Sequence, residues 1–248
     1  MGHNRQANKK IMEKEELHMI NGFKNGLEAC PVDAIVTRPR VLVACEYSGT
    51  VRQAFADMGC EAWSVDLLPT EKPGNHIQGD VLSVLEDGWD LMVGHPPCTY
   101  ISYAGTQVWD KAGRVFKRLE ALEFFAKLWE APIPHICLEN PKSCASPVIA
   151  KYSQEIQPYY FGDPQLKTTW LWLKNLPKLK WKAKSDLFSQ KTATKKPEPF
   201  AVSNTERAKK RYYTEGVTRD PKERARFWPG IAKAMAEQWA PIIFEKDG

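Results

Sequence analysis

Short apolar runs alternate with helically spaced stretches through most of the chain. Short runs that hold several β-branched or aromatic side chains predict buried strands. The expected strands are Val41–Cys45, Glu61–Val65, Asp90–Val93, His135–Leu138 and Trp170–Leu173. Apolar residues spaced three and four apart predict helices at Val51–Met58, Gly113–Trp129 and Pro229–Trp239, and Pro241 should end the last one. The apolar face of the second helix comprises Val115, Leu119, Leu122, Phe125 and Leu128.

This order of elements predicts an α/β fold with a Rossmann-like, mostly parallel sheet and helices on both faces. Sheets of this kind bind ligands in a crevice at the carboxyl ends of their strands. Four chemically useful side chains lie at or just after the ends of expected strands, namely Asp66, Asp80, Cys98 and Glu139. We therefore expect them to share one rim of the sheet.

Two segments differ from this pattern. Residues 1–38 are polar and of mixed charge, which predicts an N-terminal extension outside the main fold, with a short helix near 11–23. Residues 175–225 are rich in lysine and interrupted by proline, which predicts a small basic insertion. The main domain would then consist of residues 39–174 and 226–248.

Composition narrows the class of protein. The chain has 248 residues, of which 43% are hydrophobic and 26% charged, as expected for a soluble globular protein. A net charge of +5 permits a polyanionic partner. No stretch approaches the ~20 apolar residues of a membrane span, and no signal core follows the N-terminus. We expect a monomeric cytoplasmic protein, in a bacterial cytosol, with no membrane partner.

The six cysteines are scattered, without the spacing of a zinc site, so no metal is expected. Most are interpreted as buried, reduced thiols. Cys98 differs because it follows two prolines directly after an expected strand, and Glu139 ends the next strand. Cytosine C5 methylation needs such a pair: a thiolate adds to C6, a carboxyl group protonates N3, and C5 then attacks an electrophilic methyl group. A nearby cation would help, since a free cysteine has a pKa of ~8.5.

On these residues the chain resembles the DNA cytosine-5 methyltransferases, in particular their short phage-encoded members. Pro96-Pro97-Cys98 matches the family's Pro-Pro-Cys, and Glu139-Asn140-Pro141 is similar to its Glu-Asn-Val/Pro motif. The resemblance implies a class I fold dependent on S-adenosylmethionine (SAM), with Cys98 as nucleophile and Glu139 as N3 proton donor. Asn140 would hold the loop of Cys98. Gln165–Thr169 resembles Gln-x-Arg-x-Arg, with Lys167 ordering the active-site loop or contacting DNA.

The resemblance also implies SAM as the cofactor. The turn from Glu46 to Thr50 is similar to the family's Phe-x-Gly-x-Gly loop, although only Ser48-Gly49 stands where glycines are expected. Asp66 would bind the ribose hydroxyls, and Asp80 the adenine amine. The full expected set is Glu46, Tyr47, Ser48, Gly49, Asp66, Leu67, Asp80, Val81 and Pro96. Residues 226–236 resemble the closing helix motif of the cofactor pocket.

The expected partner is DNA, single- or double-stranded. The basic segment is too short for extensive major-groove readout, so phosphate contacts should dominate and sequence specificity should be short or loose. The target base must leave the stack, which costs least on single strands. The expected nucleic-acid-binding residues are Tyr100, Tyr103, Gln107, Lys180, Trp181, Lys182, Lys184, Arg224 and Arg226.

Several alternatives stay open at the level of sequence. In the first alternative the substrate is RNA, such as tRNA. In the second, the arginines at 224 and 226 recognise a modified donor such as carboxy-SAM. A non-catalytic nucleic-acid-binding module is a third. An amino-group methyltransferase is disfavoured, because Cys98 follows the prolines where an aromatic residue would be needed. Taken one at a time, Cys98 can be a structural thiol, and Asp66 and Asp80 can be helix caps. His95 and His135 are interpreted as loop or structural histidines.

Overall fold

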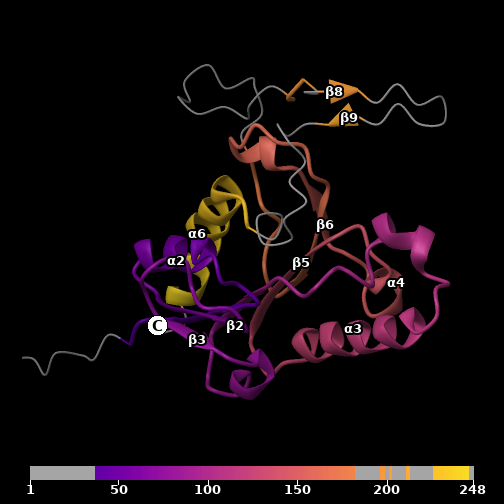
Figure 1. Ribbon diagram of the computed structural model, residues 1–248. Helices are drawn as coiled ribbons and strands as arrows, with labels where there is room; N and C mark the ends of the chain where they lie inside the picture. The colour runs from indigo at the N-terminus through magenta and orange to yellow at the C-terminus, as the bar shows by residue number, and fades with distance from the viewer. Residues whose placement is uncertain (1–36, 182–195, 199–200, 203–210, 213–225, 246–248) are drawn as a thin grey trace, which may run out of the picture. The chain divides into compact units, whose positions relative to one another are not determined.

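The computed structural model describes residues 37–181, 196–198, 201–202, 211–212 and 226–245 (Figure 1). Apart from Thr37 these residues belong to one compact unit, Arg38–Gly248. The predicted N-terminal helix near 11–23 lies outside the described residues.

The elements follow one another in the α/β order that the sequence predicts. The strands are β1 (Arg40–Ala44), β2 (Glu61–Asp66), β3 (His76–Gln78), β4 (Leu91–Gly94), β5 (His135–Pro141), β6 (Gln154–Ile156), β7 (Thr169–Lys174), β8 (Ala201–Val202) and β9 (Arg211–Tyr212). The α-helices are α2 (Thr50–Asp57), α3 (Arg114–Trp129), α4 (Ala145–Val148) and α6 (Pro229–Phe244). Short 3-10 helices are η1 (Val81–Val84), η2 (Tyr103–Val108) and η3 (Pro158–Phe161).

The main sheet has seven strands in the order β3-β2-β1-β4-β5-β7-β6. β3, β2, β1, β4 and β5 pair in parallel, whereas β7 pairs antiparallel with both β5 and β6. The predicted α/β class is confirmed, with a mixed sheet that is parallel over its first five strands. β6 is a short strand that the sequence pattern did not predict.

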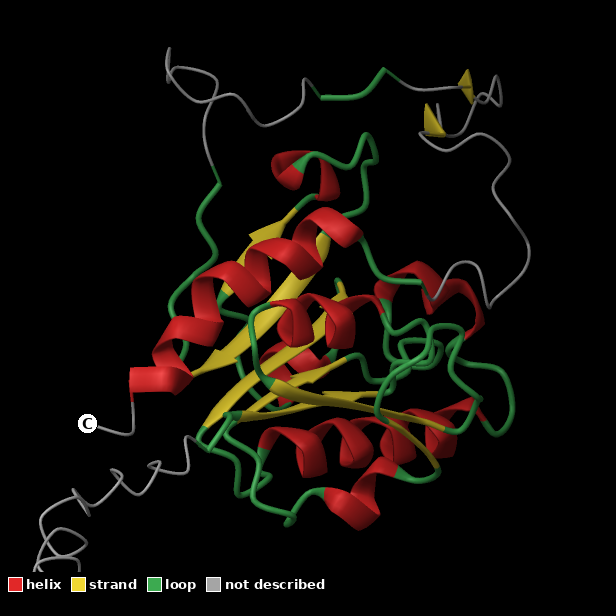
Figure 2. Cartoon of the chain, turned by 90° about the vertical axis from the view of Figure 1, so that its left-hand side faces the viewer, coloured by secondary structure: helices red, strands yellow, loops and turns green. Residues whose placement is uncertain are grey.

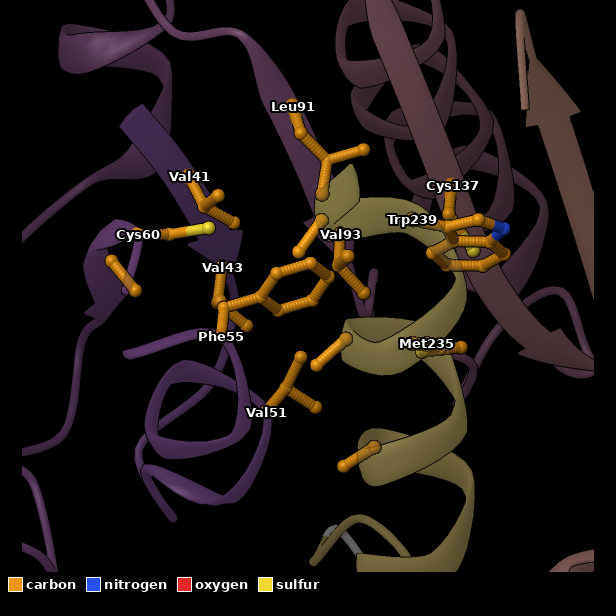
Figure 3. Close-up of a cluster of buried hydrophobic side chains, with 14 of the residues drawn as sticks. Val41, Val43, Val51, Phe55, Cys60, Leu91, Val93, Cys137, Met235 and Trp239 are labelled. Carbon is orange, nitrogen blue, oxygen red and sulfur yellow. The ribbon is translucent and has the colours of Figure 1, made fainter. Parts of the chain in front are cut away.

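Helices cover both faces of the sheet, as predicted (Figure 2). Alternate residues of the strands point to opposite faces because the side-chain period of a strand is two. Val43 and Val93 pack against α2 and α6, and Figure 3 shows Phe55 of α2 in this layer. Leu42 and Met92 face the other way and pack with Phe125 and neighbouring residues of α3.

Two details of the helices differ from the predictions. The last helix continues through Pro241 to Phe244, so the prediction that Pro241 ends it is wrong. Ile243 beyond the proline is 2% exposed, and its burial offsets the hydrogen bond that proline cannot donate. In α3 only Phe125 and Leu128 are buried, while the amino-terminal half of the predicted apolar face is open to solvent.

Residues 175–181 pack on the main domain. Leu179 lies in the core beside α6, and its backbone exchanges hydrogen bonds of 2.8 Å with the Gln154 side chain at both its N–H and its carbonyl. The Trp239 indole of α6 donates to the carbonyl of Pro177 at 3.0 Å. The beginning of the predicted basic segment therefore belongs to the folded core.

Candidate active site

The strand order reverses between β1 and β4, and a crevice at the carboxyl ends of such neighbours is where open α/β sheets bind ligands. The chain turns out of β1 at Cys45, whose backbone is left-handed with φ 58°. It leaves β4 at His95, whose N–H donates to the carbonyl of Ala44 at 2.9 Å. The loops with the predicted chemistry therefore start side by side.

The loop that carries Cys98, called the cysteine loop below, is tied to the end of β5 by Asn140. This side chain is 1% exposed, and its Nδ2 donates to the carbonyl of Pro96 at 2.8 Å. A buried hydrogen bond of this length fixes the backbone two residues before Cys98, whose side chain is half-buried. The resemblance implied this contact for Asn140.

Further backbone bonds join the same two segments. The N–H of Tyr103 donates to the carbonyl of Lys142, and that of Cys144 donates to the carbonyl of Ile101, at 2.9 and 3.0 Å. Ser102 and Ser143 form an antiparallel bridge between them. The Cys98 carbonyl accepts from the Ser102 N–H at 2.9 Å, so the loop is a closed turn held at both ends.

Glu139 lies on the face of β5 that carries Cys137, toward α2 and α6. Its Oε2 is 3.2 Å from Nδ1 of His95, and both side chains are 12% exposed. Burial raises the pKa of Glu139, but the hydrogen bond from His95 and the charges of Lys167 and His95 together hold it below its ordinary value. The structure thus brings His95, Glu139 and Lys167 together.

The loop after β1 is organised around a buried carboxylate. Glu46 accepts from the N–H groups of Val51 and Arg52 at 2.7 and 3.2 Å, and from the Ser48 hydroxyl at 3.0 Å. An acidic side chain stabilises the amino terminus of a helix, here α2. The Glu46 carboxylate is therefore occupied by the protein, and the side chains of Tyr47 and Ser48 are also buried.

Gly49, the residue just before α2, has φ 67°, and a Cβ there would lie 2.6 Å from Nη2 of Arg52. The position therefore requires glycine both for its backbone angle and for the close approach of the guanidinium. The backbone of the loop at this point is the part that a ligand in the crevice could approach.

Asp66 ends β2 and Asp80 follows β3 by two residues; the N–H of Gly79 donates to the Asp66 carbonyl at 2.9 Å, which brings the two segments together. The pKa of the Cys45 thiol is raised to about 12, chiefly by burial and then by the charges of these two aspartates. Oδ1 of each aspartate accepts from the N–H two residues later, at 2.9 and 3.0 Å. Val81 beside Asp80 is buried, whereas Leu67 beside Asp66 is 74% exposed.

Arg52 is a structural residue of this rim that the sequence did not reveal. It is 1% exposed, and its guanidinium donates to Ser64 Oγ at 2.9 Å and to the carbonyls of Lys72 and Pro73 at 2.7 and 2.9 Å. These bonds hold the loop between β2 and β3. The available signal was a charged residue next to Val51 on the expected core face of the helix.

An aromatic and basic surface adjoins the cysteine loop. Arg114 donates to the carbonyl of Thr99 at 3.3 Å and lies over the Tyr100 ring at 4.8 Å, with Lys117 at 5.7 Å from that ring. Phe116, on the same turn of α3, is 71% exposed. Tyr103 and Gln107 of η2 are exposed as well.

The other predicted nucleic-acid residues are dispersed. Trp181 stacks on Tyr160 with ring centroids 4.5 Å apart, and Lys180 next to it is exposed. Arg226 binds both carboxylate oxygens of Glu71 at 3.1 Å. The predicted residues Lys182, Lys184 and Arg224 lie outside the described residues.

Within the described ranges no group of three or more His, Cys, Asp or Glu side chains could hold a metal ion. No helix in the same ranges is long and apolar enough to cross a membrane. The five cysteines described are free thiols. Cys60 and Cys137 are buried, whereas Cys45, Cys98 and Cys144 are half-buried, so the prediction that most of the cysteines are buried is wrong.

Comparisons with known proteins identify no family. No family model matches the chain, and no curated protein matches it. Among solved structures, a co-crystal structure of WbdD with the kinase inhibitor LY294002 is similar with a TM-score of 0.36 and 13% identity. The match covers 73% of this chain and 42% of that one, so this chain spans less than half of that protein. A likeness this low carries no argument about activity.

Proposed function

We propose that this protein transfers a methyl group from SAM to C5 of cytosine in DNA through a covalent bond between Cys98 and C6. One observation carries the proposal: the Asn140 side chain holds the Pro96 carbonyl at 2.8 Å, which ties the cysteine loop to the strand that presents Glu139. A nucleophile and an acid that act on one ring must be held in a fixed relation, because a small displacement costs much of the rate.

The two groups have complementary tasks. The Cys98 sulfur forms the bond to C6, the C5–C6 double bond shifts to C4–C5, and N3 takes a proton from Glu139. Glu139 must bind that proton from solvent before the step, because its pKa lies below the ordinary value. Release requires loss of the C5 proton and expulsion of the thiolate. Lys167, whose charge acts on Glu139, stabilises the carboxylate that remains.

The rim beside this pair has the groups that SAM would need, and SAM supplies an electrophilic methyl group when bound. Asp66 and Asp80 end neighbouring strands, and each uses only Oδ1 in its local turn. Their carboxylates would bind the ribose hydroxyls and the adenine amine, with Val81 beside the ring. Since the Glu46 side chain is occupied by α2, the backbone near Gly49 would contact the donor.

The nucleic acid would lie on the surface around Tyr100 and α3. Cations over aromatic rings and an exposed phenylalanine suit a partner with phosphates and unstacked bases. Arg114 connects this surface to Thr99, which follows the nucleophile. Cytosine would then enter the site from an unpaired or flipped position.

Trapping with 5-fluorocytosine tests the proposal. Fluorine at C5 cannot leave as the proton does, so intact mass should reveal a protein–DNA adduct when SAM and substituted DNA are present. The adduct should be lost in Cys98→Ala and kept in Cys144→Ala, a matched control in the adjoining segment. Its mass reports whether the transferred group is methyl or carboxymethyl.

Competition between DNA and RNA distinguishes the open substrates. An adduct with RNA alone would replace DNA by RNA in the proposal. Absence of an adduct on single-stranded DNA, duplex DNA and RNA, together with unimpaired DNA binding by Cys98→Ala, would refute catalysis and support a binding module. For a modified donor, Arg226 would have to leave the two oxygens of Glu71.

A further inference from the structure

His95 differs from the structural histidines of this protein. His76 has partners for both ring nitrogens, with Nδ1 2.9 Å from Ser64 Oγ and Nε2 3.0 Å from the Leu68 carbonyl. His95 has Nδ1 on Glu139 at 3.2 Å, whereas its buried Nε2 has no partner among the residues described. Buried polar atoms of purely structural residues are normally satisfied. The contact of Nδ1 with a candidate acid is what sets His95 apart from His76 and points to a role in the site.

The ring has a fixed orientation. It contacts Phe227, just before α6, with ring centroids 4.5 Å apart and an angle of 48° between the rings. Its backbone N–H is fixed on Ala44 at 2.9 Å. Packing on one side and a strand contact on the other leave the imidazole aimed at one oxygen of Glu139.

We propose that His95 is a positioning residue for Glu139: its Nδ1–H holds Oε2, so that Oε1 is directed at the base and the carboxylate is compensated when its proton leaves. This inference rests on the proposed function. In the step, Oε1 gives its proton to N3 as the Cys98 sulfur bonds to C6, and the Nδ1–H of His95 keeps donating to Oε2. An imidazole with a lone pair at Nδ1 would instead accept the acid's proton and withhold it from N3.

The neighbouring charges stabilise the carboxylate form of Glu139, which is the form that remains after the proton has left. Lys167, before β7, is the other cation that acts on Glu139, and the hydrogen bond from His95 lowers the pKa of Glu139 more than the charge of Lys167 does. Cys137 is the titratable neighbour on β5, and burial first and then the charge of Glu139 raise its pKa well above the ordinary value. Cys137 therefore stays a thiol and does not compete for the proton.

Two substitutions distinguish the effect of the Nδ1–H donor of His95 from the effect of its aromatic ring. His95→Phe keeps an aromatic ring against Phe227 and removes the donor, whereas His95→Asn keeps an N–H near the position of Nδ1 without a titrating group. The matched control is His135→Asn, at the start of β5, where Nδ1 of the native residue is 2.8 Å from the Asn175 carbonyl. We expect the control to leave the chemistry unchanged.

The first readout needs no activity. Carbon-13 NMR of the Glu139 carboxyl group in the full chain, assigned with Glu139→Gln, should show a higher pKa in His95→Phe and a partial return in His95→Asn. The second is the single-turnover rate of 5-fluorocytosine adduct formation against pH. In His95→Phe the rate of adduct formation should be lower than in the wild type by about 10-fold or more at all pH values. His95→Asn should recover part of the rate, because its side-chain amide still offers an N–H to Oε2 of Glu139.

The outcomes are distinct from those of the proposed function. If the wild type forms no adduct, the methyltransferase proposal fails, and the NMR titration still tests the contact between His95 and Glu139. If the wild type reacts, and His95→Phe has the same rate, the same pH profile and the same Glu139 titration as the wild type, the positioning role is overturned. Recovery of the rate by His95→Asn, with no effect of His135→Asn, supports it.

Discussion

Replacing Arg52 by methionine should destabilise the protein severely. Methionine keeps an unbranched chain in the core but removes the guanidinium, which donates to Ser64, Lys72 and Pro73 at 2.7–2.9 Å. Longer bonds of 3.3 Å to the Thr70 hydroxyl and the Asn75 carbonyl are lost as well. Each bond from a charged donor contributes about 1.5–3 kcal/mol, but bonds from one group are not additive.

The loop carbonyls are partly exposed and can be hydrated once the guanidinium is gone, whereas Ser64 is fully buried. We therefore expect Arg52→Met to lower the free energy of unfolding by about 3–5 kcal/mol, as for the loss of one partner from a buried charged network. Arg52→Lys should cost about 2 kcal/mol, because an ammonium has three donors and no planar fork. Burial lowers the pKa of Arg52 and the charge of Glu46 opposes this, so the group stays charged in the fold.

Urea unfolding followed by tryptophan fluorescence measures these changes. Gln53→Met, the exposed neighbour on α2, is the matched control and should change stability by at most about 0.5 kcal/mol. Under the proposed function, SAM binding by Arg52→Lys should weaken as well, since the loop that Arg52 holds follows Asp66. A loss below about 1 kcal/mol for Arg52→Met, with the same denaturant slope as the wild type, would refute the reasoning.

Three further predictions follow from the contacts. Asn140→Ala should lower the free energy of unfolding by about 1–3 kcal/mol and slow adduct formation about 100-fold; an unchanged rate would show that the loop does not depend on this bond. Lys117→Gln should lower the slope of log DNA affinity against log salt concentration by about 1. Lys127→Gln, which loses a 2.8 Å ion pair with Glu123 on the same helix, should leave this slope unchanged. Because burial and the charges of Asp66 and Asp80 raise the pKa of the half-buried Cys45 thiol to about 12, mass mapping should find it unmodified by iodoacetamide at pH 8, and alkylation in the folded state would contradict the raised pKa.

The local sequence determined most of the strands and helices, because the apolar patterns that predict them lie within a few residues of one another. The valines and leucines around Leu42 and Met92 predicted buried strands, which the structure confirms, and the polar residues after them predict a ligand-binding edge. The pairing of Asn140 with the cysteine loop was implied by resemblance, and the proximity of Asp66 to Asp80 by the order of the strands. These were accessible because parallel strands all present the same end to one rim.

Only the tertiary structure decided which side chains meet. The register of β5 against β4 and β7 turns Glu139 toward the α6 face, where His95 and Phe227 lie, and nothing local to His95 indicated this. The burial of Arg52 likewise depends on a loop that begins more than ten residues later in the chain. The apolar pattern of α3 did not show that its first half is open to solvent, with Phe116 exposed. A pattern records which residues favour burial, but the partner that covers a residue comes from a distant segment, and its position is fixed only when the whole sheet and its helices pack.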